Sequence, residues 1–248
     1  MRVEPFTVGD YVHVYNRGNR KQDIVHDEKD KWRFMQALRF FNDVHSSQNI
    51  LRDILKLSVS GIDRQISVPD SVFQTGWPNN WPEREPLVQI ICYFLGQNQY
   101  HLLLKEIKEN GISKFMQKLG IGYTNYSNTR HKEVGRIFQG PYKSKTVSEQ
   151  FYLEYLTVYI QVKNVFELFP GGFDAAIRNL DEAFAFAERY PFSSYPDFAG
   201  LRHSLIIDRT NEELGENILN SQHYKKFARE VMEAREYEAL LEGLKIDE

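Results

Sequence analysis

Two polar side chains that can bind a metal ion or a phosphate lie two positions apart in an apolar stretch. Gln99 and His101 follow the apolar run 87–95 and a turn signal at Gly96, so they fall on the second strand of a predicted hairpin. Alternate residues of a strand share a face, so both side chains point the same way. Burying them without partners is costly. The pair is therefore either a satisfied polar cluster or one wall of a site.

Basic residues form a second group of candidates. Arg17, Arg20 and Lys21 cluster at the end of the alternating segment 12–17, where they could meet phosphates. Residues 98–147 hold nine basic and three acidic side chains, whereas residues 207–248 hold six and eleven. The chain thus has a basic middle and an acidic end despite a formal net charge of −3. This distribution suits nucleic acid, but on charge alone solvated helix faces are the preferred interpretation.

The composition is that of an ordinary globular protein. Hydrophobic residues make up 42% and charged residues 26% of 248 positions, enough to bury a substantial core. The single cysteine, Cys92, excludes an intramolecular disulfide and is expected to be a core thiol. Residues 1–7 have no apolar signal core, and no run approaches the ~20 apolar residues of a membrane span. We therefore expect a cytoplasmic protein without a membrane partner.

Hydrophobic periodicity and cap signals predict an α+β fold. The predicted elements are a strand at 12–17, a helix capped by Asp27 with Phe34, Met35, Leu38, Phe41 and Val44 on one face, strands at 87–95 and 98–105, a helix capped by Ser113, a strand at 136–145 and a helix capped by Ser148. This is the βαββαβ order of a ferredoxin-like antiparallel sheet with helices on one face, extended by one C-terminal helix.

Two further parts complete the predicted organisation. Residues 48–86 are rich in proline and tryptophan and are predicted to be an insertion with one short helix, and 128–135 is predicted to be a basic loop. A domain boundary is expected at the Pro170-Gly171-Gly172 turn, dividing a domain at 1–170 from a helical extension at 171–248. Candidate helices in the extension lie at 175–189, 211–219 and 224–244, around a turn region at 191–200. We expect these acidic helices to serve packing or partner binding.

Four sequence motifs occur in an order that resembles a known family. They are the run Val12-His-Val-Tyr-Asn-Arg-Gly-Asn-Arg, the strand Gln97-Asn-Gln-Tyr-His-Leu-Leu-Leu, the pair Gly122-Tyr-Thr-Asn-Tyr-Ser-Asn and Gly135-Arg-Ile-Phe-Gln-Gly, and the helix that carries Tyr159-Ile160. Together they resemble the IS200-like (HUH-type) transposases over roughly residues 8 to 200. The closer match is to the REP-associated tyrosine transposase branch.

The resemblance implies an enzyme that cleaves and rejoins single-stranded or hairpin DNA through a 5′-phosphotyrosine, with Mg²⁺ or Mn²⁺ held by a His-hydrophobic-His pair. Tyr159 falls at the nucleophile and His101 at the second histidine. Gln99 stands in place of the first histidine, and Lys163 stands where a polar residue usually completes the metal site. The Asn-Pro pair that usually follows the nucleophile is Lys163-Asn164 here.

These departures have chemical consequences. A phenol with a pKa near 10 needs a nearby cation or base to act as a nucleophile at neutral pH. Gln99 still offers a carbonyl oxygen, which suits a hard ion, so the predicted metal site is weakened. Lys163 has no lone pair while charged and would repel a metal, but it is beside Tyr159 on a helix. It could stabilise the phenolate or hold the phosphate. Tyr155, one turn earlier, is the rival nucleophile.

For DNA contact, the sequence offers basic and aromatic side chains in alternation. Tyr123, Tyr126, Phe138 and Tyr142 could stack on bases, although half of them are expected in the core. The predicted DNA-binding residues are Arg17, Arg20, Lys21, Arg130, Lys132, Arg136, Lys143 and Lys145. Three alternatives stay open: an active transposase, a domesticated DNA- or RNA-hairpin binder with little or no activity, and a protein-interaction module. The family contains both homodimers and monomers, so the resemblance leaves the oligomeric state open.

Overall fold

The structure is a computed structural model that describes residues 6–45, 82–208, 214 and 218–234. Most of the insertion predicted at 48–86 lies outside the described residues. The helices predicted at 211–219 and 224–244 lie only partly within them.

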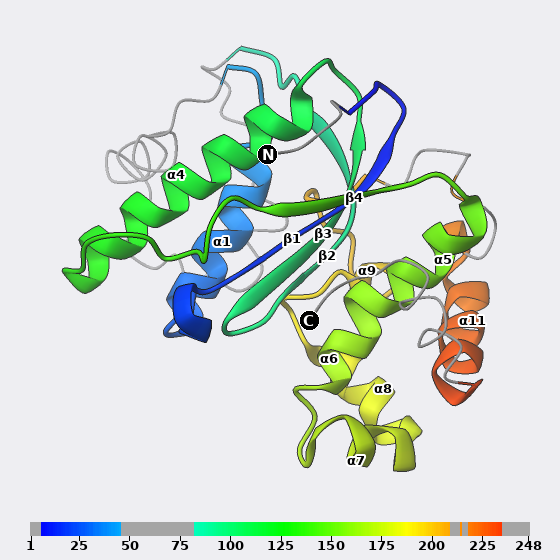
Figure 1. The fold of residues 1–248 in the computed structure, drawn as a ribbon. Helices are drawn as coiled ribbons and strands as arrows, with labels where there is room; N and C mark the ends of the chain where they lie inside the picture. The colour runs from blue at the N-terminus through cyan, green and yellow to red at the C-terminus, as the bar shows by residue number, and fades with distance from the viewer. Residues whose placement is uncertain (1–5, 46–81, 209–213, 215–217, 235–248) are drawn as a thin grey trace, which may run out of the picture.

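Four strands form one antiparallel sheet at the centre of the molecule (Figure 1). The strands are β1 (Tyr11–Arg17), β2 (Val88–Leu95), β3 (Gln99–Glu106) and β4 (Lys143–Val147), in the spatial order β2-β3-β1-β4. Among the described residues, one α-helix lies between β1 and β2 and another between β3 and β4. This arrangement confirms the predicted α+β, βαββαβ fold, with β1 and β3 in the middle and β4 at one edge.

Two helices cover one face of the sheet, α1 (Glu28–Phe40) and α4 (Gly111–His131). Asp27 caps α1 as predicted, because its side chain accepts the backbone N–H of Asp30 at 3.0 Å. The two helices touch closely at Gly122, where an added Cβ would lie 2.3 Å from Cζ of Phe41. Figure 1 shows the pair on the same side of the sheet. Their apolar sides pack on β1, β2 and β3 to form the first core.

Helix α4 differs from the prediction at both ends. It begins at Gly111, and Ser113 lies inside its first turn. The buried carboxylate of Glu106 accepts the backbone N–H groups of Gly111 at 2.9 Å and of Ile112 at 2.8 Å, so a residue from β3 does the work of a cap. At the other end the helix runs on to His131, so the first half of the predicted loop 128–135 is helical.

Strand β4 starts later than predicted. Residues 136–142 lack regular structure, apart from an isolated bridge between Gly18 and Phe138, and pairing with β1 begins at Lys143. Pro141 has no backbone N–H to donate to a ladder, which explains why the strand cannot begin earlier.

The opposite face of the sheet is covered by the chain after β4 (Figure 1). The helices described in this part are α5 (Gln150–Val158), the π-helical turn η2 (Tyr159–Lys163), α6 (Asn164–Phe166), α7 (Gly172–Arg178), α8 (Leu180–Arg189), α9 (Tyr195–Phe198) and α11 (Ser221–Ala234). Glu149 occupies the N-cap position of α5 in place of Ser148. The helix predicted at 175–189 is broken at Asn179, whose φ of −131° and ψ of 57° are not helical.

A second core lies between these helices and the sheet, with Ile91, Cys92, Phe94 and Leu103 contributed by the strands. Cys92 is a buried free thiol, as predicted. A polar network crosses this core: the Gln161 side chain donates to the Tyr224 hydroxyl at 2.6 Å and accepts from Ser194 Oγ at 2.5 Å. The network ties η2 to α9 and α11. Within the described residues, no helix has the length and apolar character to cross a membrane.

Candidate active site on the second face of the sheet

Two histidines from neighbouring central strands meet on the face covered by η2. In the register of β1 and β3, Tyr15 is opposite His101 and His13 is opposite Leu103. Alternation therefore puts His13, Tyr15 and His101 on one face. The rings of Tyr15 and His101 stack with centroids 5.6 Å apart, and those of His13 and Tyr15 with centroids 5.0 Å apart. Because these rings come from adjacent strands, the sheet itself fixes their positions.

The two imidazoles are buried and joined to each other. His13 Nε2 lies 3.0 Å from His101 Nδ1, a hydrogen-bond distance in which one ring donates and the other accepts. His13 Nδ1 is buried without a hydrogen-bond partner among the described residues. Burial lowers the pKa of His101 to about 3, helped by the positive charge of Lys163. Burial, His101 and Lys145 likewise lower the pKa of His13. Both rings are therefore neutral at pH 7.

These lowered pKa values predict a pH-dependent stability. An unfolded histidine binds a proton near pH 6.5, whereas folded His101 does so only near pH 3. Between those values the unfolded state binds more protons, so stability falls as the pH falls below about 6.5. The expected loss is up to about 1.4 kcal/mol per pH unit for each histidine. Urea unfolding at pH 7 and pH 5 measures it. A free energy of unfolding that stays constant between these values contradicts the prediction, and His101→Phe should reduce the slope.

Tyr159 completes the cluster from the helical side. It is the first residue of the π-helical turn η2, is only 8% exposed, and its ring lies nearly perpendicular to both imidazole rings. The ring centroids lie 5.8 Å from that of His101 and 6.2 Å from that of His13. Burial, Glu167 and Tyr15 raise the pKa of its phenol above the ordinary value. The hydroxyl is therefore protonated at neutral pH in this state of the protein.

Lys163 lies beside Tyr159, as the helical spacing predicted. Its Nζ is 5.3 Å from the centroid of the Tyr159 ring and 2.5 Å from Oε1 of Glu167. The ammonium is thus held between an aromatic face and a carboxylate. Glu167 partly neutralises this cation, which could otherwise stabilise a phenolate of Tyr159.

The fit of this donor set to Mg²⁺ or Mn²⁺ is poor. Gln99 is partly exposed at the start of β3, opposite Arg17, while His101 is engaged by His13. Among the described residues, no three His, Cys, Asp or Glu side chains converge as metal ligands need to. These ions prefer oxygen donors, and Lys163 adds repulsion. An ion between Gln99 and His101 stays a prediction, and no chemical step below is assigned to a metal.

Lysines of the edge strand border the cluster. In the register of β1 and β4, Lys143 is opposite Tyr15 and Lys145 is opposite His13. Lys143 Nζ lies 5.8 Å from the centroid of the Tyr15 ring, and Lys145 contributes to the lowered pKa of His13. Two of the predicted DNA-binding residues therefore lie next to the residues that surround the predicted nucleophile. We call His13, Tyr15, His101, Tyr159 and Lys163 the histidine-tyrosine cluster.

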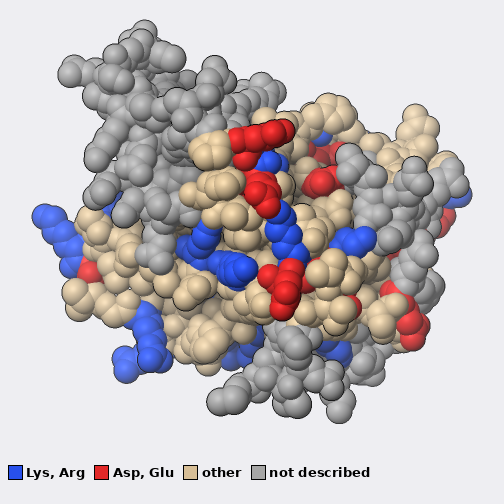
Figure 2. Space-filling view, turned by 90° about the horizontal axis from the view of Figure 1, so that it is seen from above, with Lys and Arg blue, Asp and Glu red and all other residues tan. Residues whose placement is uncertain are grey.

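The other predicted DNA-binding residues are spread over the molecule. Arg17 Nε donates to Gln139 Oε1 at 2.5 Å, and Arg20 and Lys21 are exposed on a short 3₁₀ turn, η1 (Asn19–Lys21). Lys132 is exposed after α4, and Arg136 lines a cavity on the other face of the sheet. Seen from above, Lys and Arg side chains lie among Asp and Glu side chains (Figure 2). That end of the molecule has no continuous basic surface among its described residues.

Arg130 has a structural role. It forms ion pairs with Asp27 and with Asp30, which is fully buried. Asp30 also accepts from Tyr126 Oη at 3.0 Å and lies 2.9 Å from His131 Nε2. These contacts hold the end of α4 against the start of α1. The Arg130 guanidinium is therefore occupied by ion pairs within the fold.

The predicted stacking aromatics divide into two groups. Tyr123 is buried and donates to the carbonyl of Ile24 at 2.8 Å, and Tyr126 belongs to the Asp30 network. Phe138 and Tyr142 line the cavity next to α4. Two of the four, Tyr123 and Phe138, are buried core residues, while Tyr126 and Tyr142 are partly buried beside that core, so half of the set lies in the core as expected.

Sequence reasoning did not single out His13 as a site residue. It is 88 positions from His101, and only the register of β1 and β3 brings the two together. The available signal was its place between Tyr11 and Tyr15 in an alternating strand.

No family model matches the sequence, and no curated protein matches it. One similar solved structure is described as a REP-associated tyrosine transposase bound to a REP hairpin. That chain is 12% identical, with 87% of this chain and 96% of the other covered, at a TM-score of 0.42. Values this low carry no argument about the site. What this chain has in its own right is a βαββαβ fold with the histidine-tyrosine cluster on one face of its sheet.

Proposed function

We propose that this chain binds single-stranded or hairpin DNA over the second face of its sheet and cleaves and rejoins it through Tyr159. The observation that carries the proposal is the meeting of Tyr159 with His13 and His101, which come from three separate parts of the sequence. The REP-associated resemblance seen in the sequence motifs supports the same assignment. If Tyr159 served only to pack the core, apolar neighbours would suffice, and the cost of burying two polar imidazoles beside it would have no reason.

The proposed reaction is a transesterification. The Tyr159 oxygen forms a bond to the scissile phosphorus while the bond to the 3′ oxygen breaks, which leaves a 5′-phosphotyrosine and a free 3′ hydroxyl. The phenol loses one proton and the 3′ oxygen gains one, so the step is balanced. Attack by the 3′ hydroxyl reverses it and rejoins the strand. Lys163 would stabilise the phenolate, and Lys143 and Lys145 would hold the phosphate.

A labelled DNA hairpin with a single-stranded tail tests the proposal. Incubation with the protein is expected to give a covalent protein-DNA adduct that survives denaturation. Parallel reactions with Mn²⁺, with Mg²⁺ and with a chelator test whether the site needs an ion. Tight hairpin binding without any adduct under all three conditions contradicts cleavage.

Glu167→Gln is expected to increase adduct formation. Glu167 holds Lys163 at 2.5 Å and contributes to the raised pKa of Tyr159. Its neutralisation frees the ammonium for a phosphate and favours the phenolate. Because the pair is partly exposed, we expect a rise of about two- to fivefold in the initial rate of adduct formation.

Glu188→Gln is the matched control for this change. Glu188 is also paired with a lysine, at 2.7 Å from Nζ of Lys225, but on α8 and α11. It should leave the rate unchanged. Equal effects of the two substitutions would point to a change in overall charge and contradict the role of Glu167.

A second candidate function is hairpin binding without cleavage. The raised pKa of Tyr159 and the ion pair that occupies Lys163 favour it, because both disfavour a nucleophilic phenolate. Gln99→His distinguishes the two functions. If the natural chain binds hairpins without an adduct and Gln99→His produces one, the chain is a binder that has lost its activity.

A further inference from the structure

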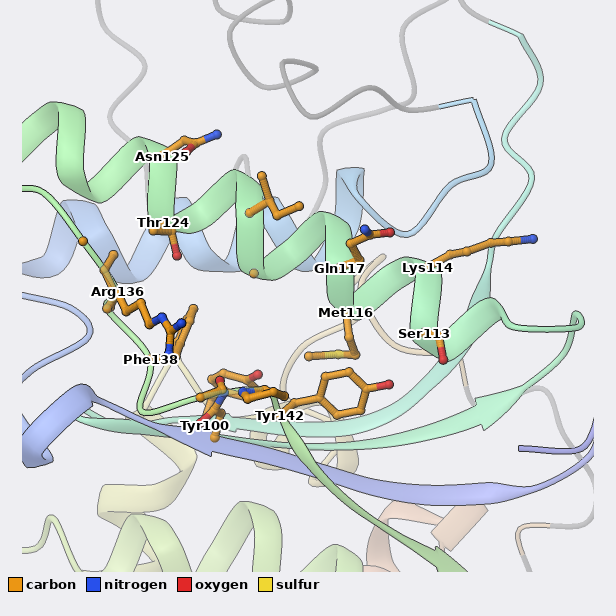
Figure 3. A pocket seen from close by; sticks show the side chains of 17 residues that line it. Tyr100, Ser113, Lys114, Met116, Gln117, Thr124, Asn125, Arg136, Phe138 and Tyr142 are labelled. Atoms are coloured by element: carbon orange, nitrogen blue, oxygen red, sulfur yellow. The ribbon is translucent and has the colours of Figure 1, made fainter. Parts of the chain in front are cut away.

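A large cavity on the opposite face of the sheet plays no part in the proposed cleavage. Its volume is about 810 Å³, and it lies between α4 and the irregular segment that precedes β4 (Figure 3). Cavities of this size hold small organic ligands.

The lining of the cavity suits a planar, anionic ligand. Tyr100, Phe138 and Tyr142 lie between α4 and the strands, with Met116 above them (Figure 3). The rings of Tyr100 and Phe138 are nearly perpendicular, with centroids 5.7 Å apart. Tyr100, Phe138 and Met116 are largely buried and form the floor of the cavity, whereas Tyr142 is partly exposed and offers its ring for stacking against a flat ligand.

The charges at the cavity have one sign. Arg136, which reaches toward Phe138 in Figure 3, and Lys114 are both part of its lining. Among the described residues that line it, none is Asp or Glu. A guanidinium beside an aromatic surface favours a flat ring that carries a phosphate, which is the chemistry of a nucleotide.

The cavity is connected to the histidine-tyrosine cluster through the edge of the sheet. Tyr142 lines the cavity, and the next residue, Lys143, lies over the Tyr15 ring on the other face. On β3, Tyr100 likewise lines the cavity, while the next residue, His101, belongs to the cluster on the other face. Since β4 is the edge strand of the sheet, a single DNA strand that passes around β4 can contact both the cavity and the histidine-tyrosine cluster.

We infer that this cavity binds one unpaired base of the DNA, with its phosphate on Arg136, while the neighbouring phosphates cross β4 to the cluster. The inference rests on the proposed function and adds a substrate feature to it: a single-stranded tail with one base held at a fixed position. The cavity is then a specificity site, separate from the place of cleavage.

Gly120→Phe tests the inference, because Gly120 lines the cavity from α4 and an added Cβ would meet nothing within 4 Å. The larger side chain should therefore fill the cavity without disturbing the core. Gly120→Ala is the matched control, because it makes the same change to the helix backbone without filling the space.

The probe is a fluorescent DNA hairpin with an unpaired tail, together with a series in which one tail nucleotide at a time is abasic. For the natural chain and Gly120→Ala, one abasic position should weaken binding about tenfold. Gly120→Phe should bind every probe with the same reduced affinity. The inference is overturned if Gly120→Phe retains the position-dependent loss or if no abasic position matters.

Adduct formation, measured in the same samples, separates this inference from the proposed function. Adducts that form regardless of any abasic position leave the function standing and remove the base site. A natural chain that neither binds nor cleaves hairpins removes both. If adenosine monophosphate binds in a way that Gly120→Phe prevents, while no hairpin binds, the occupant is a free nucleotide and the DNA assignment is overturned.

Discussion

Tyr159→Phe is expected to abolish the covalent DNA adduct while the protein stays folded. The change removes only the oxygen that would bond to phosphorus. The ring keeps its place against His101 and His13, since those contacts are ring-to-ring contacts that do not need the hydroxyl. Hairpin affinity should change little, because the phosphate contacts proposed for Lys143 and Lys145 remain. Denaturing gel electrophoresis with a labelled hairpin measures the adduct, and circular dichroism checks the fold.

Tyr155→Phe is the control for this experiment. Tyr155 is one turn earlier on α5, and its ring packs against Phe227 of α11 with centroids 5.2 Å apart. It is the rival nucleophile by sequence, but its contacts lead away from the histidines. It should retain the adduct. An adduct that survives Tyr159→Phe and disappears in Tyr155→Phe would overturn the assignment of the nucleophile.

Asp30→Ala is expected to lower the free energy of unfolding by about 3 to 5 kcal/mol. Asp30 is fully buried and is paired with Arg130 and His131, with Tyr126 as a further donor. Removal of the carboxylate leaves a guanidinium without its buried partner at the junction of α1 and α4. Urea unfolding at pH 7 measures the loss.

Asp27→Ala provides the comparison on the same network. Asp27 pairs with the same arginine and caps α1, but its side chain is about half exposed. The expected loss is about 1 kcal/mol, the ordinary cost of a lost helix cap. Equal losses for the two aspartates would contradict the view that burial makes Asp30 the dominant partner.

Much of the fold follows from local patterns in the sequence. Alternation placed β1, the 3.6-residue period and Asp27 placed α1, and the apolar runs placed the central hairpin. The boundaries that differ depend on nearby residues whose effect is not a standard cap signal. Glu106 caps α4 from a neighbouring strand, and Pro141 delays β4. Neither effect has a local signature as clear as a serine or threonine cap.

The site was less accessible from sequence than the fold. The motifs pointed to His101, Tyr159 and Lys163, which the structure brings together on one face. His13 needed the strand register, and the pairing of Lys163 with Glu167 needed the rotamers of two long side chains. The basic residues looked alike in the sequence, yet the structure places two of them at the cluster, one at the cavity and one in the Asp30 network, and the others away from all three. Their roles depend on which side of the sheet each one faces.

The π-helical turn η2 that carries Tyr159 also determines how far α6 is rotated about the helix axis relative to α5. The backbone N–H of Asn164 bonds to the carbonyl of Tyr159, five residues back, whereas an α-helix bonds four residues back. The additional residue rotates the chain that follows by about 100° relative to a continuous α-helix. As a result α5 meets β4 while α6 meets α8. Deletion of a single residue from η2 would therefore leave a regular helix that can keep only one of two contacts, that of α5 with β4 or that of α6 with α8.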